Sequence, residues 1–325
     1  MVTCGRCKNK TFISGDLAPF ESEPCQKCGH PVMLPVMLRN FELRTIIASG
    51  GMGTVYTAHD VKLEREVALK MMKREMAADP EIMQAFYREA RAGAALNHTN
   101  IIHVYSFDEF EGQPYLVMEL ADQGSLDHRI ETEGVVPELD VLDVGIKMAS
   151  ALSAALKHNL LHRDIKPGNI LYNSEGEPKL IDFGLVRAAE AGHIWEEQVW
   201  GTVYYVAPEK IERKGEDFHS DMYSLGGTLY HALTGHVPFE APTVDEVVAA
   251  HVHTPLTPPN DVVPAISQTT SDALARAMAK NPGDRFADYQ EMGMALEQAR
   301  SELLVQQVRQ ADQRPSGKSW WRIKG

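Results

Sequence analysis

The sequence predicts an α+β fold in which a strand-rich region comes first and a larger helical region follows. Strand-like runs separated by a glycine-rich turn lie within residues 41–72, and helical spacing of apolar residues dominates from Pro137 onward. All four cysteines lie in the first 28 residues, which predicts a small module in front of this fold. With 325 residues, the chain is long enough for one large two-lobed domain or two ordinary domains.

The bulk composition excludes several classes of protein. Hydrophobic residues make up 44% of the chain and charged residues 24%, as in an ordinary globular protein. No run of 18 or more apolar residues occurs, so we expect no transmembrane segment, and the N-terminus lacks the pattern of a secretory signal. The net charge of −13 argues against a general nucleic-acid-binding protein, so no nucleic-acid partner is expected.

The cysteines form two tight Cys-x2-Cys pairs separated by 17 residues. This spacing predicts a closed, structural zinc site of the zinc-ribbon type, with the ligands Cys4, Cys7, Cys25 and Cys28. Two redox pairs or free thiols are the alternatives, and His30 could replace a cysteine. The clustering favours metal in a reducing compartment, so we expect a cytoplasmic protein. The first 35 residues carry four basic and three acidic residues, which favours a protein partner at this module over nucleic acid.

The rest of the chain divides into predicted segments and elements. We expect residues 1–34 to form the zinc-ribbon module, residues 35–40 a linker, and residues 41–300 one continuous domain. Apolar runs predict strands at 41–48, 54–59, 67–71 and 115–120. Helical spacing predicts helices at 80–96, 139–158, 222–233, 272–279 and 289–308. Residues 301–325 form a helical extension and a basic tail, whose Trp320–Trp321 pair could touch a membrane surface or a partner; a disordered tail is the alternative.

The stretch HRDIKPGNIL, residues 162–171, is followed eleven residues later by the triplet Asp-Phe-Gly. Within it, Asp164 could accept a hydroxyl proton and Lys166 could neutralise phosphate charge. Asn169 and Asp182, the first residue of the triplet, could together hold a magnesium ion. Such a triplet alone is common by chance, but its distance from the His-Arg-Asp run makes the combination a specific signal for phosphoryl transfer.

A glycine-rich turn lies between two of the predicted strands, and its backbone N–H groups could close over phosphates without side-chain obstruction. The residues of this turn that would cover a nucleotide are Ala48, Gly50, Gly51 and Gly53. Lys70 ends the next strand, 17 residues after Gly53, and Glu89 on the following helix could pair with it. Each feature alone has a simpler interpretation: a hairpin turn, a lysine at the surface and a solvated glutamate.

In this order, the motifs of residues 41–300 resemble the catalytic domain of bacterial-type (Hanks-type) serine/threonine protein kinases. The resemblance implies a bilobal protein-kinase fold, with a small β-rich N-lobe at about 41–120 and a large helical C-lobe at about 121–300. It implies ATP with Mg²⁺ or Mn²⁺ between the lobes, and protein substrates that carry Ser or Thr. The alternatives are a pseudokinase-like nucleotide-binding scaffold that docks partners through the zinc ribbon, and a small-molecule kinase of related fold.

The same resemblance implies roles for individual side chains. Lys70 would hold the nucleotide phosphates and pair with Glu89. Val55, Ala68 and Leu171 would sandwich the adenine ring, and Met118 would be the gatekeeper residue. The backbone of Glu119 and Ala121 would hydrogen-bond the base, whereas plain core packing is the alternative for the apolar side chains.

Three further contacts follow from the resemblance. Asp221 would brace the backbone of the catalytic loop, and Thr202 would contact Asp164 and Lys166. Glu209 would form a structural ion pair with Arg285.

The activation segment departs from the family pattern. Residues 185–200 contain no Ser, Thr or Tyr, although Arg163 stands where family members often need a phosphate as its partner. We hypothesise that Glu196 or Glu197 pairs with Arg163 and replaces that phosphate, in which case alanine at both positions should reduce activity; exposed charges are the alternative. Gly93 lies inside a predicted helix and costs about 1 kcal/mol relative to Ala, which predicts a mobile helix.

Overall fold

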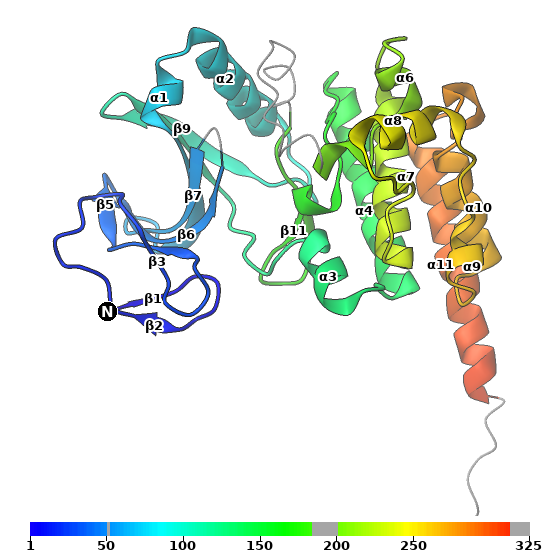
Figure 1. Cartoon of the computed structure of the whole chain (residues 1–325), viewed down its shortest axis with the longest axis horizontal. Coiled ribbons are helices and arrows are strands. Elements are labelled where there is room, and N and C mark those ends of the chain that lie inside the picture. The colour runs from blue at the N-terminus through cyan, green and yellow to red at the C-terminus, as the bar shows by residue number, and fades with distance from the viewer. Residues whose placement is uncertain (51–52, 184–200, 313–325) are drawn as a thin grey trace, which may run out of the picture.

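The computed structural model describes residues 1–50, 53–183 and 201–312, apart from the side chains of residues 85, 89 and 310–312. It shows a strand-rich lobe and a helical lobe that follow one another along the chain, as the sequence predicts (Figure 1). The N-terminal cysteine module lies against the strand-rich lobe.

The strand-rich lobe is built on a six-stranded antiparallel sheet with the order β5-β6-β7-β8-β10-β9. Its strands are β5 (Val36–Leu38), β6 (Phe41–Ser49), β7 (Gly53–Asp60), β8 (Arg65–Met72), β9 (Val104–Phe110) and β10 (Gln113–Met118). Alternate side chains of the central strands turn inward, and Leu43, Ala58 and Leu69 are fully buried. This sheet carries the glycine-rich turn between β6 and β7.

The predicted linker at residues 35–40 is instead part of this sheet. Val36–Leu38 forms β5, which pairs with β6 through Leu38 and Phe41. The prolines at 31 and 35 indicated a break, but a proline just before an edge strand removes no ladder hydrogen bond. The cysteine module is therefore joined to the sheet through a strand of the sheet itself.

Two helices cover one side of the sheet, α1 (Arg74–Ala77) and α2 (Pro80–Ala95). Helix α2 begins after Asp79, whose carboxylate accepts a 2.8 Å hydrogen bond from the backbone N–H of Glu81. Its buried residues Phe86 and Ala90, four apart on one face, pack against Met72 of β8 and the neighbouring strand β10. This packing places α2 beside the strand that carries Lys70.

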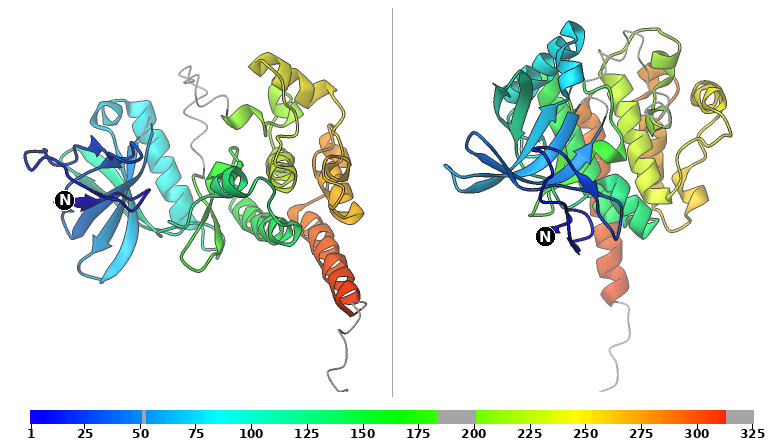
Figure 2. Two further views of the ribbon diagram at one scale, coloured as in Figure 1. Left: turned by 60° about the horizontal axis from the view of Figure 1, so that its bottom comes forward. Right: turned by 60° about the vertical axis from the view of Figure 1, so that its left-hand side comes forward.

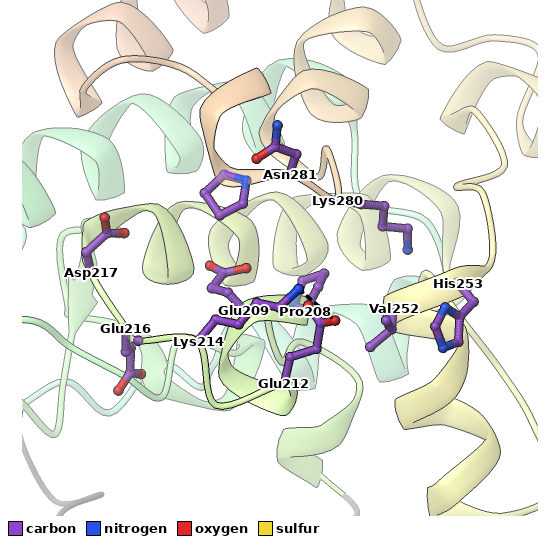
Figure 3. A pocket seen from close by; sticks show the side chains of 12 residues that line it. Pro208, Glu209, Glu212, Lys214, Glu216, Asp217, Val252, His253, Lys280 and Asn281 are labelled. Carbon is purple, nitrogen blue, oxygen red and sulfur yellow. Dashed lines mark ion pairs between the residues drawn. The ribbon is translucent and has the colours of Figure 1, made fainter.

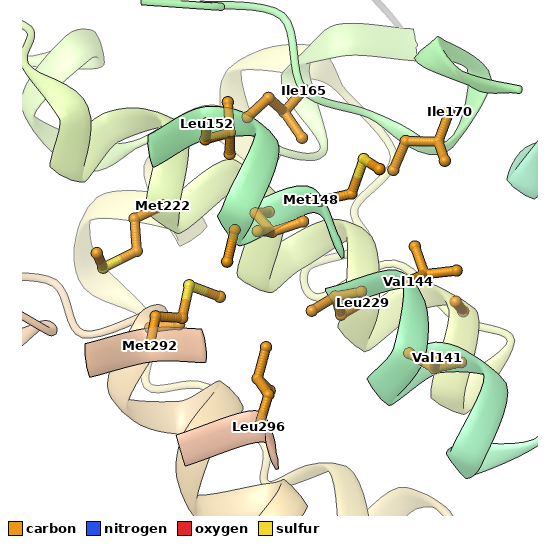
Figure 4. Packing of buried hydrophobic residues seen from close by; sticks show 14 of the residues in the cluster. Val141, Val144, Met148, Leu152, Ile165, Ile170, Met222, Leu229, Met292 and Leu296 are labelled. Atoms are coloured by element: carbon orange, nitrogen blue, oxygen red, sulfur yellow. The ribbon is translucent and has the colours of Figure 1, made fainter. Parts of the chain in front are cut away.

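The helical lobe is formed by α3 (Leu126–Glu133), α4 (Glu138–Lys157), α6 (Pro208–Ile211), α7 (Phe218–Thr234), α8 (Val244–His253), α9 (Pro259–Val262), α10 (Gln268–Ala277) and α11 (Tyr289–Asp312). Its core lies where α4, α7 and α11 meet, and Figure 4 shows Met148, Leu229 and Leu296 pointing toward one another there. The predicted helices at 139–158, 222–233, 272–279 and 289–308 correspond to α4, α7, α10 and α11.

The stretch at residues 162–171 lies on the face of this core that is turned toward the sheet. The short helix η1 (Pro167–Asn169) leads into β11 (Ile170–Tyr172), which pairs with β12 (Pro178–Leu180). Ile165 and Ile170 are buried in the helical core on either side of η1, so the polar residues between them are held near the sheet. Sequence patterns missed β11 and β12 because three-residue strands carry too few residues to show a period.

The cysteine module consists of two short hairpins, β1 (Val2–Thr3) with β2 (Lys10–Thr11) and β3 (Glu23–Pro24) with β4 (Pro31–Val32). Both views in Figure 2 show it against the strands of the N-terminal sheet. Met33 is buried in the core of that sheet, and Phe20 packs against the same core. The module is thus docked on the sheet through apolar contacts.

Among the helices that the structure describes, none combines the length and the apolarity that crossing a membrane requires. The Trp320–Trp321 pair lies outside the described residues.

Candidate active site

One buried carboxylate holds the backbone of the loop at residues 162–169, which is the predicted catalytic loop. Asp221, near the start of α7, accepts hydrogen bonds of 2.7 Å from the backbone N–H groups of His162 and Arg163. Burial raises the pKa of Asp221, whereas the nearby His162 and the two N–H donors act in the opposite direction. The bracing contact predicted for Asp221 is confirmed, and it fixes the backbone immediately before Asp164.

The carboxylate of Asp164 is held by three neighbouring side chains. The Asn169 side-chain amide donates to the Asp164 backbone carbonyl at 2.7 Å and to Oδ2 at 3.0 Å. Lys166 Nζ lies 2.9 Å from the same Oδ2, and Thr202 Oγ1 donates to Oδ1 at 3.2 Å. Because Lys166 Nζ also donates to Thr202 Oγ1 at 3.1 Å, these groups form a closed network around one carboxylate. The contacts predicted for Thr202 are present.

Lys70 and Asp182 meet at the boundary between the two lobes. Lys70 Nζ lies 3.0 Å from Asp182 Oδ1, and the lysine side chain is only 12% exposed. Asp182 has a positive φ of 63°, a strained conformation for a residue with a side chain, of a kind that recurs at functional sites. The side chain of Glu89 lies outside the described residues, so its pairing with Lys70 stays a prediction.

Asn169 and Asp182 are the residues predicted to hold magnesium. Asn169 is 7% exposed, and its amide nitrogen is the atom that bonds Asp164. Its amide oxygen is therefore the atom suited to a cation, since oxygen ligands are what Mg²⁺ takes. The backbone N–H of Ile181, next to Asp182, donates to the carbonyl oxygen of Asn169 at 3.1 Å and ties the two sites together.

A cavity of about 260 Å³ opens beside these groups, between the sheet and the catalytic loop. Its lining includes the predicted residues Ala48, Val55, Ala68, Lys70, Met118, Glu119, Ala121, Leu171 and Asp182. The backbone N–H of Glu119 already donates to the His103 carbonyl oxygen at 2.8 Å, so its own carbonyl is the group suited to bonding a base. The predicted Gly51 lies outside the described residues, whereas Gly50 and Gly53 flank the turn beside Ala48.

The cavity has further lining residues that sequence patterns missed: Ile47, Gly93, Ile101, Ile102, Val104, Leu116, Gly168, Ile181 and Phe183. A Cβ built on Gly93 would lie 2.6 Å from Val104 Cγ2, so glycine allows α2 to approach β9 closely. The sequence signal was a glycine in the interior of a helix, which predicted a mobile helix, whereas the structure shows a close packing contact. Ile47 enters the lining through a β-bulge, which no sequence pattern marks.

Arg163 has an anionic partner, Glu216, which the sequence did not predict. Its Nε lies 3.3 Å from Glu216 Oε2, and the Glu216 side chain is 18% exposed. Lys210 Nζ joins the same carboxylate at 3.2 Å and donates to the Arg163 carbonyl oxygen at 3.1 Å. Glu196 and Glu197, predicted as partners of Arg163, lie outside the described residues and stay a prediction.

The order and geometry of these groups are matched by known proteins. The protein kinase domain model matches residues 41–298, which is more than half of the chain. The chain belongs to the protein kinase family. The crystal structure of the PknI kinase domain of Mycobacterium tuberculosis resembles it with a TM-score of 0.62 and 27% sequence identity, covering 82% of this chain and 98% of that chain.

The similar curated proteins are bacterial serine/threonine-protein kinases. PknL of Mycobacterium tuberculosis is 38% identical over 264 residues, which are 81% of this chain and 66% of PknL. PknB of Mycobacterium leprae is 35% identical over 264 residues, which are 79% of this chain and 42% of PknB. The chain thus spans slightly less than two thirds of PknL and less than half of PknB. Its kinase fold and its likeness to the bacterial Ser/Thr type are those expected from the sequence.

The kinase C-lobe contains a buried ion pair away from the cavity. Arg285 donates from both terminal guanidinium nitrogens to Glu209 at 2.8 Å, and the side chains of Arg285 and Glu209 are 0% and 8% exposed. Burial raises the pKa of Glu209, but the contact with Arg285 lowers it by more, so the net shift of the pKa is downward. The predicted ion pair is confirmed, and it joins α6 to the segment before α11.

A second hollow, of about 790 Å³, lies on the C-lobe among α6, the end of α8 and the segment around Lys280 (Figure 3). At its rim Glu212 pairs with Lys214 at 2.9 Å. Lys280 donates to the His251 carbonyl oxygen at 2.7 Å, and burial lowers the pKa of Lys280 to about 8. These described side chains make structural contacts, and the groups suited to phosphoryl transfer lie at the smaller, apolar cavity.

The cysteine module, outside the family match, has the geometry of a metal site. The Sγ atoms of Cys4, Cys7, Cys25 and Cys28 all lie within 4.8 Å of one another. Sulfurs 2.3 Å from a tetrahedral zinc ion stand about 3.8 Å apart, close to the observed 3.7 Å for Cys4–Cys28 and 3.6 Å for Cys7–Cys25. Within the cluster, hydrogen bonds from Thr11 and the Lys27 backbone lower the pKa of the Cys25 thiol to about 6. Burial and the neighbouring cysteines raise the pKa of the Cys28 thiol to about 11, so the sulfur geometry is the evidence for a metal site.

Proposed function

We propose that this chain is an active serine/threonine protein kinase that transfers the γ-phosphoryl group of ATP to hydroxyl groups of protein substrates. The observation that carries the proposal is the closed network of Asp164, Lys166, Thr202 and Asn169 beside the Lys70–Asp182 pair. Bacterial Ser/Thr kinases among the similar proteins support the substrate class.

Asp164 orients the substrate hydroxyl and takes its proton as the oxygen bonds to the γ-phosphorus and the bond to the ADP oxygen breaks. A free aspartate has a pKa of about 4 and is a weak base, so positioning is its larger contribution. Lys166 offsets the charge of the transferring group, and Thr202 holds the side chains of Lys166 and Asp164 in place. The 3.2 Å and 3.1 Å bonds of Thr202 support this role.

The nucleotide occupies the 260 Å³ cavity in this proposal. Its apolar walls suit the adenine ring, and the backbone of Glu119 and Ala121 bonds the base. The glycine-rich turn covers the phosphates, and Lys70, aligned by Glu89, bonds them. Asn169 and Asp182 hold Mg²⁺ or Mn²⁺, which supplies charge neutralisation when bound.

The cysteine module, residues 1–34, is proposed to hold a structural Zn²⁺ and to precede a kinase domain at 41–300. The sulfur spacing supports the zinc ligands. A reducing, cytoplasmic location accords with thiolates that bind metal. A protein partner at this module and a partner for the tail beyond residue 300 stay predictions.

The test is incorporation of radiolabelled phosphate from ATP into a generic basic protein, with wild type and Asp164→Asn compared. We expect a loss of about 10²–10⁴-fold in the variant, because the amide can neither accept the proton nor keep the charged contact with Lys166 that helps to position the reacting groups. Titration with a magnesium–nucleotide complex is the control, and both proteins should bind it. Equal labelling by both proteins would remove the kinase proposal and favour a nucleotide-binding scaffold; labelling of small molecules alone would favour a small-molecule kinase.

A further inference from the structure

The two cysteine-bearing turns of the module converge on one backbone carbonyl of the kinase sheet. His30, two residues after Cys28, has its Nε2 2.8 Å from the carbonyl oxygen of Ile46 in β6. Gly5, next to Cys4, lies so close that an added Cβ would be 3.3 Å from the same oxygen. Because a carbonyl only accepts, His30 Nε2 carries the hydrogen in this contact.

That carbonyl lies at a β-bulge of β6, and the bulged residues 46–48 form the roof of the proposed nucleotide cavity. Ile46 is paired with Tyr56 and Ala48 with Val55, so in this ladder Ile47 is left without a cross-strand partner. Ile46 is buried in the sheet core, whereas Ile47 lines the cavity. A bulge of this kind re-aims a side chain, and the conformation of Ile46 decides where Ile47 points.

His30 is itself tied to the metal-binding turn. Its backbone carbonyl accepts a 2.8 Å hydrogen bond from the N–H of Cys25, and Gly29 donates to the Cys25 carbonyl at 2.8 Å. An ion held by the four sulfurs would fix both turns relative to each other, and with them the imidazole. The cluster of ligand atoms consists of the four cysteines, which leaves His30 for the contact with the sheet.

We infer that His30 is a positioning residue for nucleotide binding, through which the metal-loaded cysteine module holds the β6 bulge and hence Ile47 in the roof of the cavity. The inference rests on the proposed function, because it takes this cavity as the nucleotide site. It gives the module a role inside the kinase, as a clamp on the strand that leads into the glycine-rich turn.

The test measures nucleotide affinity and metal content together on the full chain. The Mg²⁺ complex of a non-hydrolysable ATP analogue is titrated into wild type, His30→Ala and His30→Gln, with His158→Ala as a control at an exposed histidine on the C-lobe. We expect His30→Ala to raise Kd about tenfold while one zinc per chain is retained. His30→Gln keeps an N–H donor and should restore most of the affinity, and His158→Ala should match wild type.

Removing zinc with a chelator provides the second measurement. We expect zinc removal to weaken nucleotide binding by wild type about as much as His30→Ala does, and to add little in the variant, because both changes break the same link. An unchanged Kd in zinc-loaded His30→Ala, or equal chelator effects in both proteins, would overturn the inference. Failure of wild type to bind the analogue would instead count against the proposed function.

Discussion

The proposed nucleotide cavity lies between a floor, the loop at residues 162–169, and a roof, the bulged end of β6 at residues 46–48, and these two regions are held by different kinds of contact. On the floor, the catalytic loop is fixed by the carboxylate of Asp221, which is 2% exposed and accepts two short backbone hydrogen bonds. In the roof, the Ile46 carbonyl at the bulge of β6 accepts a hydrogen bond from His30, a half-buried residue of the cysteine module. Buried polar groups cannot exchange a lost partner for water, whereas groups near the surface can. Changes in the floor should therefore strongly lower kcat or the free energy of unfolding, and changes in the roof should alter nucleotide affinity.

The largest expected effect concerns the Glu209–Arg285 pair beneath the floor. Glu209→Gln leaves the fully buried Arg285 charge uncompensated and should lower the free energy of unfolding by about 3–5 kcal/mol. Urea unfolding of the full chain measures this change. Replacing both residues with apolar ones should cost less than the single change. A loss below 1 kcal/mol in Glu209→Gln would contradict a structural role for the pair.

The same pair predicts a pH dependence. Because the folded-state pKa of Glu209 lies below its ordinary value of 4.5, its contribution to stability is present above that value. The contribution should be lost as pH falls through the lower, folded-state pKa. As the pH falls below 4.5, wild type should lose a part of its free energy of unfolding that Glu209→Gln does not have to lose. The difference in free energy of unfolding between the two proteins should therefore become smaller.

The next effect concerns the catalytic loop itself. In Asp221→Asn, one amide oxygen cannot replace two carboxylate oxygens, and the amide nitrogen faces a backbone N–H. A loop displaced by about 1 Å costs roughly 10²-fold in rate, so kcat should fall by that order. Nucleotide Kd should stay near the wild-type value, because Asp221 lies away from the cavity lining. A rise in Kd with unchanged kcat would be the opposite of this expectation.

A smaller effect is expected at Glu216, which neutralises Arg163 and Lys210. Glu216→Gln removes that charge beside the loop and should lower kcat about tenfold, equivalent to about 1.4 kcal/mol. Glu212→Gln in the same connecting segment is the matched control, since its pair with Lys214 is away from the loop. If Arg163→Ala lowers kcat equally in wild type and in Glu216→Gln, Arg163 and Glu216 are not coupled. The adjacent residues Glu196 and Glu197 would then again be the candidate partners of Arg163.

The smallest effect is expected at Gly93, on the roof side. Gly93→Ala gains helix propensity but brings a methyl group 2.6 Å from Val104 Cγ2, so α2 must move away from β9. We expect a loss of about 1 kcal/mol in unfolding free energy and a modest rise in nucleotide Kd. The double variant Gly93→Ala with Val104→Ala should recover the affinity. Tighter binding in the single variant would argue that mobility, rather than packing, is what the glycine provides.

The contacts of the floor could be predicted from the sequence better than those of the roof. Asp164, Lys166 and Asn169 lie within one short run, and the contacts of Thr202, Asp221 and the Glu209–Arg285 pair were predicted from motifs that accompany it. These residues are fixed by chemistry, which restricts the residue type at each position.

The roof depends on features that carry no sequence signal. Residues 35–40 were predicted as a linker because prolines flank them, yet they include an edge strand. The bulge that turns Ile47 into the cavity and the approach of His30 to Ile46 depend on register and docking between distant segments. Glu216 was missed because its distance from Arg163 along the chain gives no pattern.

Steady-state kinetics and nucleotide titration on Asp221→Asn and His30→Ala, run side by side, separate the floor from the roof most directly. We expect Asp221→Asn to lower kcat by about 10²-fold with Kd for the magnesium–nucleotide complex unchanged. His30→Ala should raise that Kd about tenfold with kcat at saturating ATP nearly unchanged. A fall in kcat together with a rise in Kd in both variants would contradict the division of work between the two sides of the cavity.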